Sequence, residues 1–173
     1  MARAWLGLGG NVGDVVAAMA FALRNLDTDR FVHVAKVSPV YKTPPWGLID
    51  QAWFHNCCAE VESGLSPEAL LVLCREQERL GKRQRSVRWG PRTIDIDVLA
   101  YEGVEQVDDN LTLPHPRMSQ RSFVIVPLAD IAPDLVIEGQ TMTQHARAQV
   151  ADELDRLDLP TDWWRQDGNQ SAR

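Results

Sequence analysis

The chain is organised around one stretch, Arg83-Gln84-Arg85-Ser86-Val87-Arg88-Trp89-Gly90-Pro91-Arg92-Thr93-Ile94-Asp95-Ile96-Asp97. Its first half is rich in arginine and contains no acid, and its second half alternates polar and aliphatic residues. Residues two apart share one face of a β-strand, so Asp95 and Asp97 are expected on one face. Carboxylates beside arginines are typical of a site for Mg²⁺ and phosphate oxygens, because Mg²⁺ usually binds carboxylates together with substrate phosphates. A solvated edge strand after a charged loop is the alternative that this stretch leaves open.

The composition narrows the class of protein. The chain has 173 residues, of which 45% are hydrophobic and 24% charged, which is enough for one domain with a full core. The N-terminus does not resemble a signal peptide, and no apolar run approaches the ~20 residues of a membrane span. We therefore expect a cytoplasmic protein without a membrane partner.

Charge and cysteine content narrow it further. The net charge is −6, yet six of the 18 lysines and arginines lie between Arg79 and Arg92, where no acid occurs. An acidic body with one basic segment favours a small polyanion over nucleic acid as the ligand. Cys57, Cys58 and Cys74 lack zinc spacing, so they are expected to be reduced packing residues, with the first two on opposite faces of a strand.

The order of expected elements indicates an α+β sandwich. Strands are predicted over residues 4–8, 31–41, 54–62 and 94–101, and helices over 15–26, 66–79, 120–131 and 143–157. Asp14 and Ser66 are placed to cap the first two helices. Residues 158–173 turn polar and are expected to form a loosely ordered tail. The turn at residues 9–14 fits neither a dinucleotide fingerprint nor a P-loop, because Val12 replaces a required glycine and Gly-Lys-Ser/Thr is absent.

Four stretches carry features that a plain core does not need. They are Gly9-Gly10-Asn11, Thr43-Pro44-Pro45-Trp46-Gly47 followed by Phe54-x-Asn56, the arginine loop with Asp95-x-Asp97, and Leu113-Pro114-His115-Pro116 followed by Arg121-x-Phe123. Over about residues 4–157 the chain resembles the 6-hydroxymethyl-7,8-dihydropterin pyrophosphokinases of folate biosynthesis. The resemblance implies a ferredoxin-like α/β sandwich with a mainly antiparallel central sheet flanked by helices, and a catalytic domain over residues 1–157.

The resemblance also implies an activity. In that family Mg²⁺-dependent enzymes transfer pyrophosphate from ATP to the hydroxymethyl group of the reduced pterin, giving AMP and the pterin diphosphate. We expect ATP and the pterin as small-molecule substrates, a pair of Mg²⁺ ions, a monomer, and no nucleic-acid partner. Two alternatives stay open: another Mg²⁺-dependent nucleotide-using transferase, and a non-catalytic nucleotide-binding module.

Matching positions imply the site residues by analogy with the family. The catalytic residues are Arg83, Arg92, Asp95 and Asp97, of which the two aspartates are the metal ligands. The ATP contacts are Glu78, Arg85, Arg88, Thr112, His115 and Arg121. The pterin contacts are Thr43, Pro44, Trp46, Phe54, Asn56 and Phe123. Arg83 is preferred to Lys82 as the first loop arginine, because its spacing to Glu78 and Trp89 fits the common form of the family.

Overall fold

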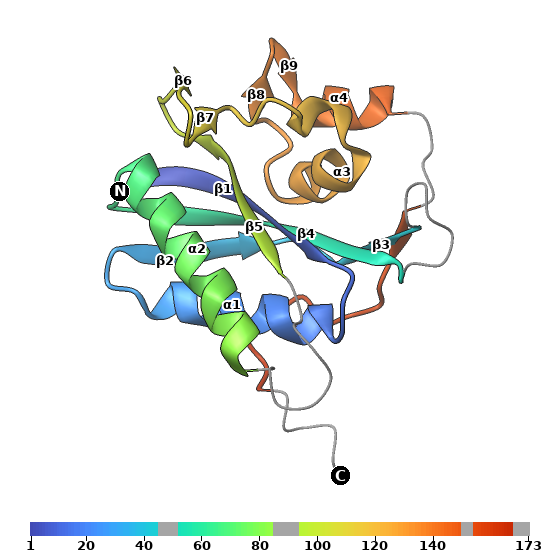
Figure 1. Ribbon diagram of the computed structural model, residues 1–173. Coiled ribbons are helices and arrows are strands. Elements are labelled where there is room, and N and C mark those ends of the chain that lie inside the picture. Colours follow the sequence, from blue (N-terminus) through green and yellow to red (C-terminus); the bar gives the residue numbers. More distant parts are fainter. Residues whose placement is uncertain (45–51, 85–93, 150–153, 168–173) are drawn as a thin grey trace.

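A six-stranded sheet lies at the centre of the fold, between two pairs of helices (Figure 1). The computed structural model describes residues 1–44, 52–84, 94–149 and 154–167, without the side chains of residues 83 and 84. The elements are β1 (Ala2–Gly10), α1 (Val15–Thr28), β2 (Val32–Val37), β3 (Tyr41–Thr43), β4 (Phe54–Ser63), α2 (Pro67–Gln84), β5 (Asp95–Tyr101), β6 (Gln106–Val107), β7 (Thr112–Leu113), η1 (Met118–Gln120), α3 (Ser122–Ile131), β8 (Val136–Ile137), β9 (Gln140–Thr141), α4 (Met142–Ala148) and β10 (Asp155–Arg156).

The central sheet is antiparallel throughout its described strand pairs. The strand order is β10-β3-β4-β1-β5, and β2 pairs with the half of β4 that β3 leaves free. Helices α1 and α2 cover one face, and α3 and α4 cover the other (Figure 1). The predicted α+β sandwich with a mainly antiparallel sheet is therefore confirmed.

Strand β4 supplies both layers of the core because its side chains alternate. Cys57, Ala59 and Val61 pack in the cluster shared with α1 and α2. Cys58 packs on the other face, in the cluster shared with α3 and α4. The prediction that neighbouring cysteines face opposite sides is confirmed, and all three cysteines are buried free thiols.

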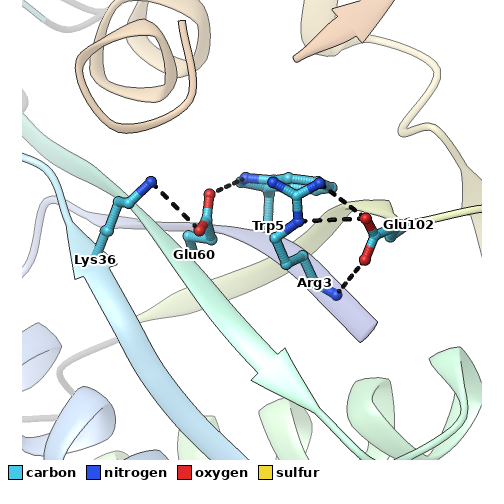
Figure 2. A network of polar contacts seen from close by, with 5 residues as sticks. All are labelled: Arg3, Trp5, Lys36, Glu60 and Glu102. Carbon is cyan, nitrogen blue, oxygen red and sulfur yellow. Dashed lines mark hydrogen bonds and ion pairs between the residues drawn. The ribbon is translucent and has the colours of Figure 1, made fainter. Parts of the chain in front are cut away.

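On the face of β1 that is directed towards α3, the size of the side chains changes along the strand. Arg3 and Trp5 fill its first half, whereas Gly7 and Gly9 leave its second half without side chains. The large residues are tied into a polar network (Figure 2). The Trp5 indole N–H donates to Glu60 at 3.0 Å, the ammonium of Lys36 lies 3.5 Å from the same carboxylate, and Arg3 pairs with Glu102 at 2.8 Å. This network fixes one end of the sheet, and the glycines open the other.

The first two helices begin where the sequence predicts. The Asp14 carboxylate accepts from the Ala17 N–H at 3.0 Å, and the Ser66 hydroxyl accepts from the Ala69 N–H at 3.2 Å. Helix α2 is longer than the predicted 66–79 and ends at Gln84. The backbone of Arg83 therefore belongs to the last turn of α2, and not to the loop in which the sequence analysis placed it.

The C-terminal part differs most from the prediction. Helix α4 ends at Ala148, so the prediction of one continuous helix over residues 143–157 is wrong. Residues 155–156 instead pair with β3, and the Leu157 N–H donates to the Val40 carbonyl at 2.9 Å. Pairing with an open sheet edge satisfies backbone groups that a free-standing helix end would leave to water.

The segment after residue 157, where a loosely ordered tail is predicted, contains two buried residues between exposed ones. Trp163 and Trp164 are buried in the α1–α2 side of the core. The Trp163 indole N–H donates to the Ser38 carbonyl at 3.1 Å, and Arg24 donates to the Trp164 carbonyl at 3.0 Å. Burial of the two indoles in the core anchors the chain as far as Trp164. Residues 168–173 lie outside the described part. Among the described helices, none is long and apolar enough to cross a bilayer.

Candidate active site

A cavity of about 520 Å³ opens over the glycine half of β1, on the α3 side of the sheet. Strands β3, β4 and β5 and helix α3 supply its walls. The residues that both the sequence analysis predicted and the cavity contains are Thr43, Phe54, Asn56, Asp95, Asp97, Arg121 and Phe123. We call this space the sheet cavity.

A second cavity of about 310 Å³ adjoins the first and lies between α2, β5 and the β7 region. It contains Glu78, Thr112 and His115, three of the predicted ATP contacts. Asp97 lines this cavity as well as the sheet cavity. The structure therefore brings the two predicted substrate sites together at one carboxylate.

The two aspartates stand side by side at the start of β5. Both side chains are exposed and flank the buried Ile96. None of the ion pairs among the described residues involves either aspartate. The described residues contain no group of three or more histidines, cysteines or acids that could hold a metal. Two open carboxylates suit a Mg²⁺ ion whose other ligands are substrate phosphates and water.

Glu78 of α2 holds the backbone between the two aspartates. Its carboxylate accepts from the Ile96 N–H at 2.7 Å. Burial raises the pKa of Glu78, and the charges of Asp95 and Asp97 raise it further, while the Ile96 hydrogen bond and Lys82 oppose the rise. Glu78 therefore fixes the strand segment that carries both carboxylates, in addition to lining the second cavity.

His115 follows β7 and lines the second cavity. Its backbone N–H donates to the Leu99 carbonyl at 2.7 Å, which ties the segment after β7 to β5. Its Nδ1 accepts from the Arg117 N–H at 3.2 Å, so a neutral ring carries its proton on Nε2. Burial lowers the pKa of His115, with Arg121 and Arg117 adding to the effect and Asp97 opposing it. The neutral ring can donate Nε2–H to an anionic oxygen.

The remaining wall of the sheet cavity suits a flat heterocycle. Phe54 comes from β4, where it pairs with Thr43 of β3, and Phe123 comes from the first turn of α3. Asn56 stands two residues from Phe54 on the same strand face. Within the described part of the chain, no group hydrogen-bonds the Asn56 amide, so its donor and acceptor are available to a ligand.

Some predicted residues are not placed by the structure. Trp46, Arg85, Arg88 and Arg92 lie outside the described residues. Pro44 is described and follows β3, but it does not line either cavity. Arg121 lines the sheet cavity, and its guanidinium lies 5.7 Å from the centre of the Phe123 ring.

The floor of the sheet cavity was not predicted from the sequence, although Gly9 belongs to one of the four stretches named there. Gly7 and Gly9 line it, together with Leu99 of β5. The signal was available, because two glycines at spacing two on a strand leave one strip of a sheet face without side chains.

Comparison with known proteins identifies the family. The model of 7,8-dihydro-6-hydroxymethylpterin-pyrophosphokinase (HPPK) matches residues 5–133. The 2-amino-4-hydroxy-6-hydroxymethyldihydropteridine pyrophosphokinase of Methylorubrum extorquens is 49% identical over 144 residues, which cover 83% of this chain and 91% of that protein. The Bacillus subtilis protein of the same name is 42% identical over 128 residues, covering 74% and 77%.

Solved structures agree at the level of the fold. Wild-type Plasmodium falciparum HPPK-DHPS with pteroate superposes with a TM-score of 0.66 at 15% identity, over 84% of this chain. The matched part is 42% of that longer chain. The sequence matches and the shared fold lead to one conclusion: the chain belongs to the 7,8-dihydro-6-hydroxymethylpterin-pyrophosphokinase family.

Proposed function

We propose that this member of a family of folate-pathway transferases transfers pyrophosphate from ATP to 6-hydroxymethyl-7,8-dihydropterin. The transfer takes place where the two cavities meet, at Asp97. The observation that carries the proposal is that Asp97 lines both the sheet cavity and the second cavity. A pterin in the first and a triphosphate in the second would bring the hydroxymethyl oxygen and the β-phosphorus to the same carboxylate. Holding the two reactants in line supplies a large part of the acceleration in such transfers.

Asp95 and Asp97 would hold a pair of Mg²⁺ ions at this junction. Their exposed carboxylates and the absence of a paired cation among the described residues fit that role. Bound there, Mg²⁺ supplies neutralisation of charge on the triphosphate oxygens. The chain's own part is to fix the spacing of the two carboxylates, which Glu78 does through Ile96.

The sheet cavity supplies recognition of the pterin. Phe54 and Phe123 offer aromatic faces, each worth about 0.5–1.5 kcal/mol beyond the area buried when a ring stacks on it. Asn56 offers one donor and one acceptor to an amide-like ring edge. Thr43 lies beside them, and we assign Pro44 and Trp46 to the same substrate through the family resemblance.

The second cavity supplies recognition of ATP. His115 donates from Nε2, and Thr112 and Glu78 lie in the same cavity. We assign Arg121 to the phosphates near the junction because it lines the sheet cavity beside Asp97. Arg83 and Arg92 are proposed to act on the transferred phosphates, with Arg85 and Arg88 as further ATP contacts, because arginine's planar fork matches phosphate oxygens. These arginine roles rest on the resemblance. A monomeric state, a cytoplasmic location and a lack of nucleic-acid and membrane partners remain part of the proposal.

Release of AMP tests the proposed function. With ATP, the pterin and Mg²⁺, the protein should release AMP and the pterin diphosphate, and omission of Mg²⁺ should stop turnover. Asp97→Asn should lower kcat at least about 100-fold, in the range found when one group that stabilises transition-state charge is removed. Glu62→Gln, an exposed carboxylate on β4 outside both cavities, is the matched control and should keep wild-type rates.

Other products would separate the alternatives. Release of ADP or of free pyrophosphate would indicate a different nucleotide-using transferase. Binding of ATP without any turnover would indicate a binding module.

A further inference from the structure

Gly9 lies between two proposed ligand groups in one row across the sheet. In the strand register it pairs with Asn56 of β4 on one side and with Asp95 of β5 on the other. All three residues line the sheet cavity. The proposed pterin contact and the proposed metal ligand are therefore separated by a single position that has no side chain.

The space above Gly9 is taken by the Asn56 amide. A Cβ built on Gly9 would lie 2.2 Å from Asn56 Oδ1 and 3.3 Å from its Cγ. Interchange of the amide oxygen and nitrogen would leave the same overlap, because the two atoms are similar in size. The backbone of Gly9 is not in the left-handed region, so any residue could adopt it. The requirement for glycine thus comes from the amide and not from the backbone.

We propose that Gly9 is a positioning residue for pterin recognition, whose missing side chain lets the Asn56 amide lie over β1 and face the substrate edge. The inference rests on the proposed role of Asn56. The amide makes no hydrogen bond to any described residue, so no polar partner within that part of the chain would restore its position if a methyl group displaced it. A displaced amide would leave the polar edge of a bound heterocycle without its partner, which weakens binding.

The neighbouring glycine shows that the effect is local to Gly9. The three atoms nearest to a Cβ on Gly7 all belong to the Leu99 side chain, the closest at 3.4 Å, which is an ordinary contact. A methyl group would therefore overlap its neighbour at position 9 and make only van der Waals contact at position 7. A side chain at position 9 should therefore weaken binding of the pterin. It should not weaken binding of ATP, whose proposed contacts lie in the second cavity.

Steady-state kinetics of Gly9→Ala tests the inference. The KM for the pterin should rise about tenfold or more, as expected when a buried polar group loses its partner, while the KM for ATP stays within about twofold. Gly64→Ala is the matched control. Its Cβ would come no closer than 3.7 Å to Phe31, and its φ is not positive, so both Michaelis constants should be those of the wild type.

A double-mutant cycle with Asn56→Ala separates positioning from general damage. Once Asn56 is alanine, the nearest described atom to the new methyl group that remains is the His55 carbonyl oxygen, at 3.4 Å. Gly9→Ala should then change the pterin KM by less than about twofold, because the two effects act through one group. An equal rise in both backgrounds, or no rise in the wild-type background, would overturn the inference.

Two further outcomes are informative. If Asn56→Ala leaves the pterin KM unchanged, the proposed role of Asn56 fails and the inference with it. If Asn56→Ala raises the KM and Gly9→Ala does not, the inference alone fails. Should Gly9→Ala fold poorly, its melting temperature is compared with that of the double variant. Recovery in the double variant supports the clash with Asn56, and equal loss in both contradicts it.

Discussion

Glu78 shows how one side chain can serve both the fold and the site. It lies on α2, yet its carboxylate satisfies a backbone N–H of β5 between the two aspartates. Three carboxylates consequently lie close together, and burial with the two aspartates raises the pKa of Glu78. The hydrogen bond that organises the site is thus made by a group whose charged form the fold disfavours.

The sign of this shift gives a prediction. The ordinary pKa of a glutamate is 4.5, and in the folded chain the pKa of Glu78 is higher. At a pH just above 4.5 the folded chain therefore keeps a proton on Glu78 that the unfolded chain releases. Stability therefore falls as pH rises through the window above 4.5, and ionised Glu78 costs stability at pH 7. Glu78→Gln keeps an acceptor without the charge, so it should be at least as stable as the wild type at pH 7, with the difference disappearing below about pH 4.

Urea unfolding of both proteins at pH 7 and pH 4 checks this prediction. Glu78→Ala is the contrasting variant, because it leaves the Ile96 N–H without an acceptor and should lose about 1–3 kcal/mol. A Gln variant that is less stable than the wild type at pH 7 and equal to Ala would show that the charge itself stabilises the fold.

At the scale of elements, one hydrogen bond ties the two walls of the sheet cavity together. The Tyr41 hydroxyl on β3 donates to the Asp130 carboxylate on α3 at 2.5 Å. Tyr41 pairs directly with Asn56 across the sheet, and Asp130 lies on the helix that carries Phe123. Strand β3, which lies next to Asn56, and helix α3, which carries Phe123, are therefore held at a fixed separation.

Removing this tie should weaken pterin binding. Tyr41→Phe should lose about 1–2 kcal/mol of stability and raise the pterin KM severalfold. Tyr101→Phe is the matched control, because the Tyr101 hydroxyl also donates at 2.5 Å, to the Leu65 carbonyl on the far side of the sheet. Both variants should melt at lower temperature, and only Tyr41→Phe should change the pterin KM. Equal Michaelis constants in the two variants would contradict the role of the tie.

Elements with a strong local signal could be predicted from the sequence. The alternation of Asp95, Ile96 and Asp97 gave the faces of β5, and Asp14 gave the start of α1. The prediction of a helix as far as Leu157 was wrong. The helical spacing of apolar residues contains no information about an open strand edge nearby in the fold. There the edge of β3 determined the conformation of residues 155–156.

For the whole molecule and its site, too, features with a local signal could be predicted and features that depend on the arrangement of elements could not. The sequence indicated the aspartate pair, Phe54, Asn56, His115 and Phe123, since each stands in a recognisable motif. It did not indicate that Asp97 joins two cavities, because that depends on how β5 lies between α2 and β1. The buried tryptophans near the C-terminus were missed because a polar segment around them concealed their packing.

The two buried tryptophans near the C-terminus lead to a prediction about how far the domain extends. Trp163 is 7% exposed and Trp164 is 4% exposed, and both pack against residues of the main core. Trp163→Ala should cost about 3–5 kcal/mol, the usual penalty for removing a large buried side chain. Trp163→Phe should cost less, because it keeps an aromatic ring and loses only the hydrogen bond to Ser38 and part of the ring. Urea unfolding measures both, and an unchanged midpoint for Trp163→Ala would show that the segment is not part of the core.

The burial of all three cysteines has a practical consequence for labelling. Burial raises the thiol pKa of each, that of Cys74 to about 12, so almost no thiolate is present in the folded chain at neutral pH. Folded protein should therefore react slowly with Ellman's reagent, and three thiols should react once guanidinium unfolds it. A cysteine introduced at Val72, which is 65% exposed on α2, would then be the fast-reacting thiol among four. Fluorophores or spin labels could be attached there while the native cysteines stay in place.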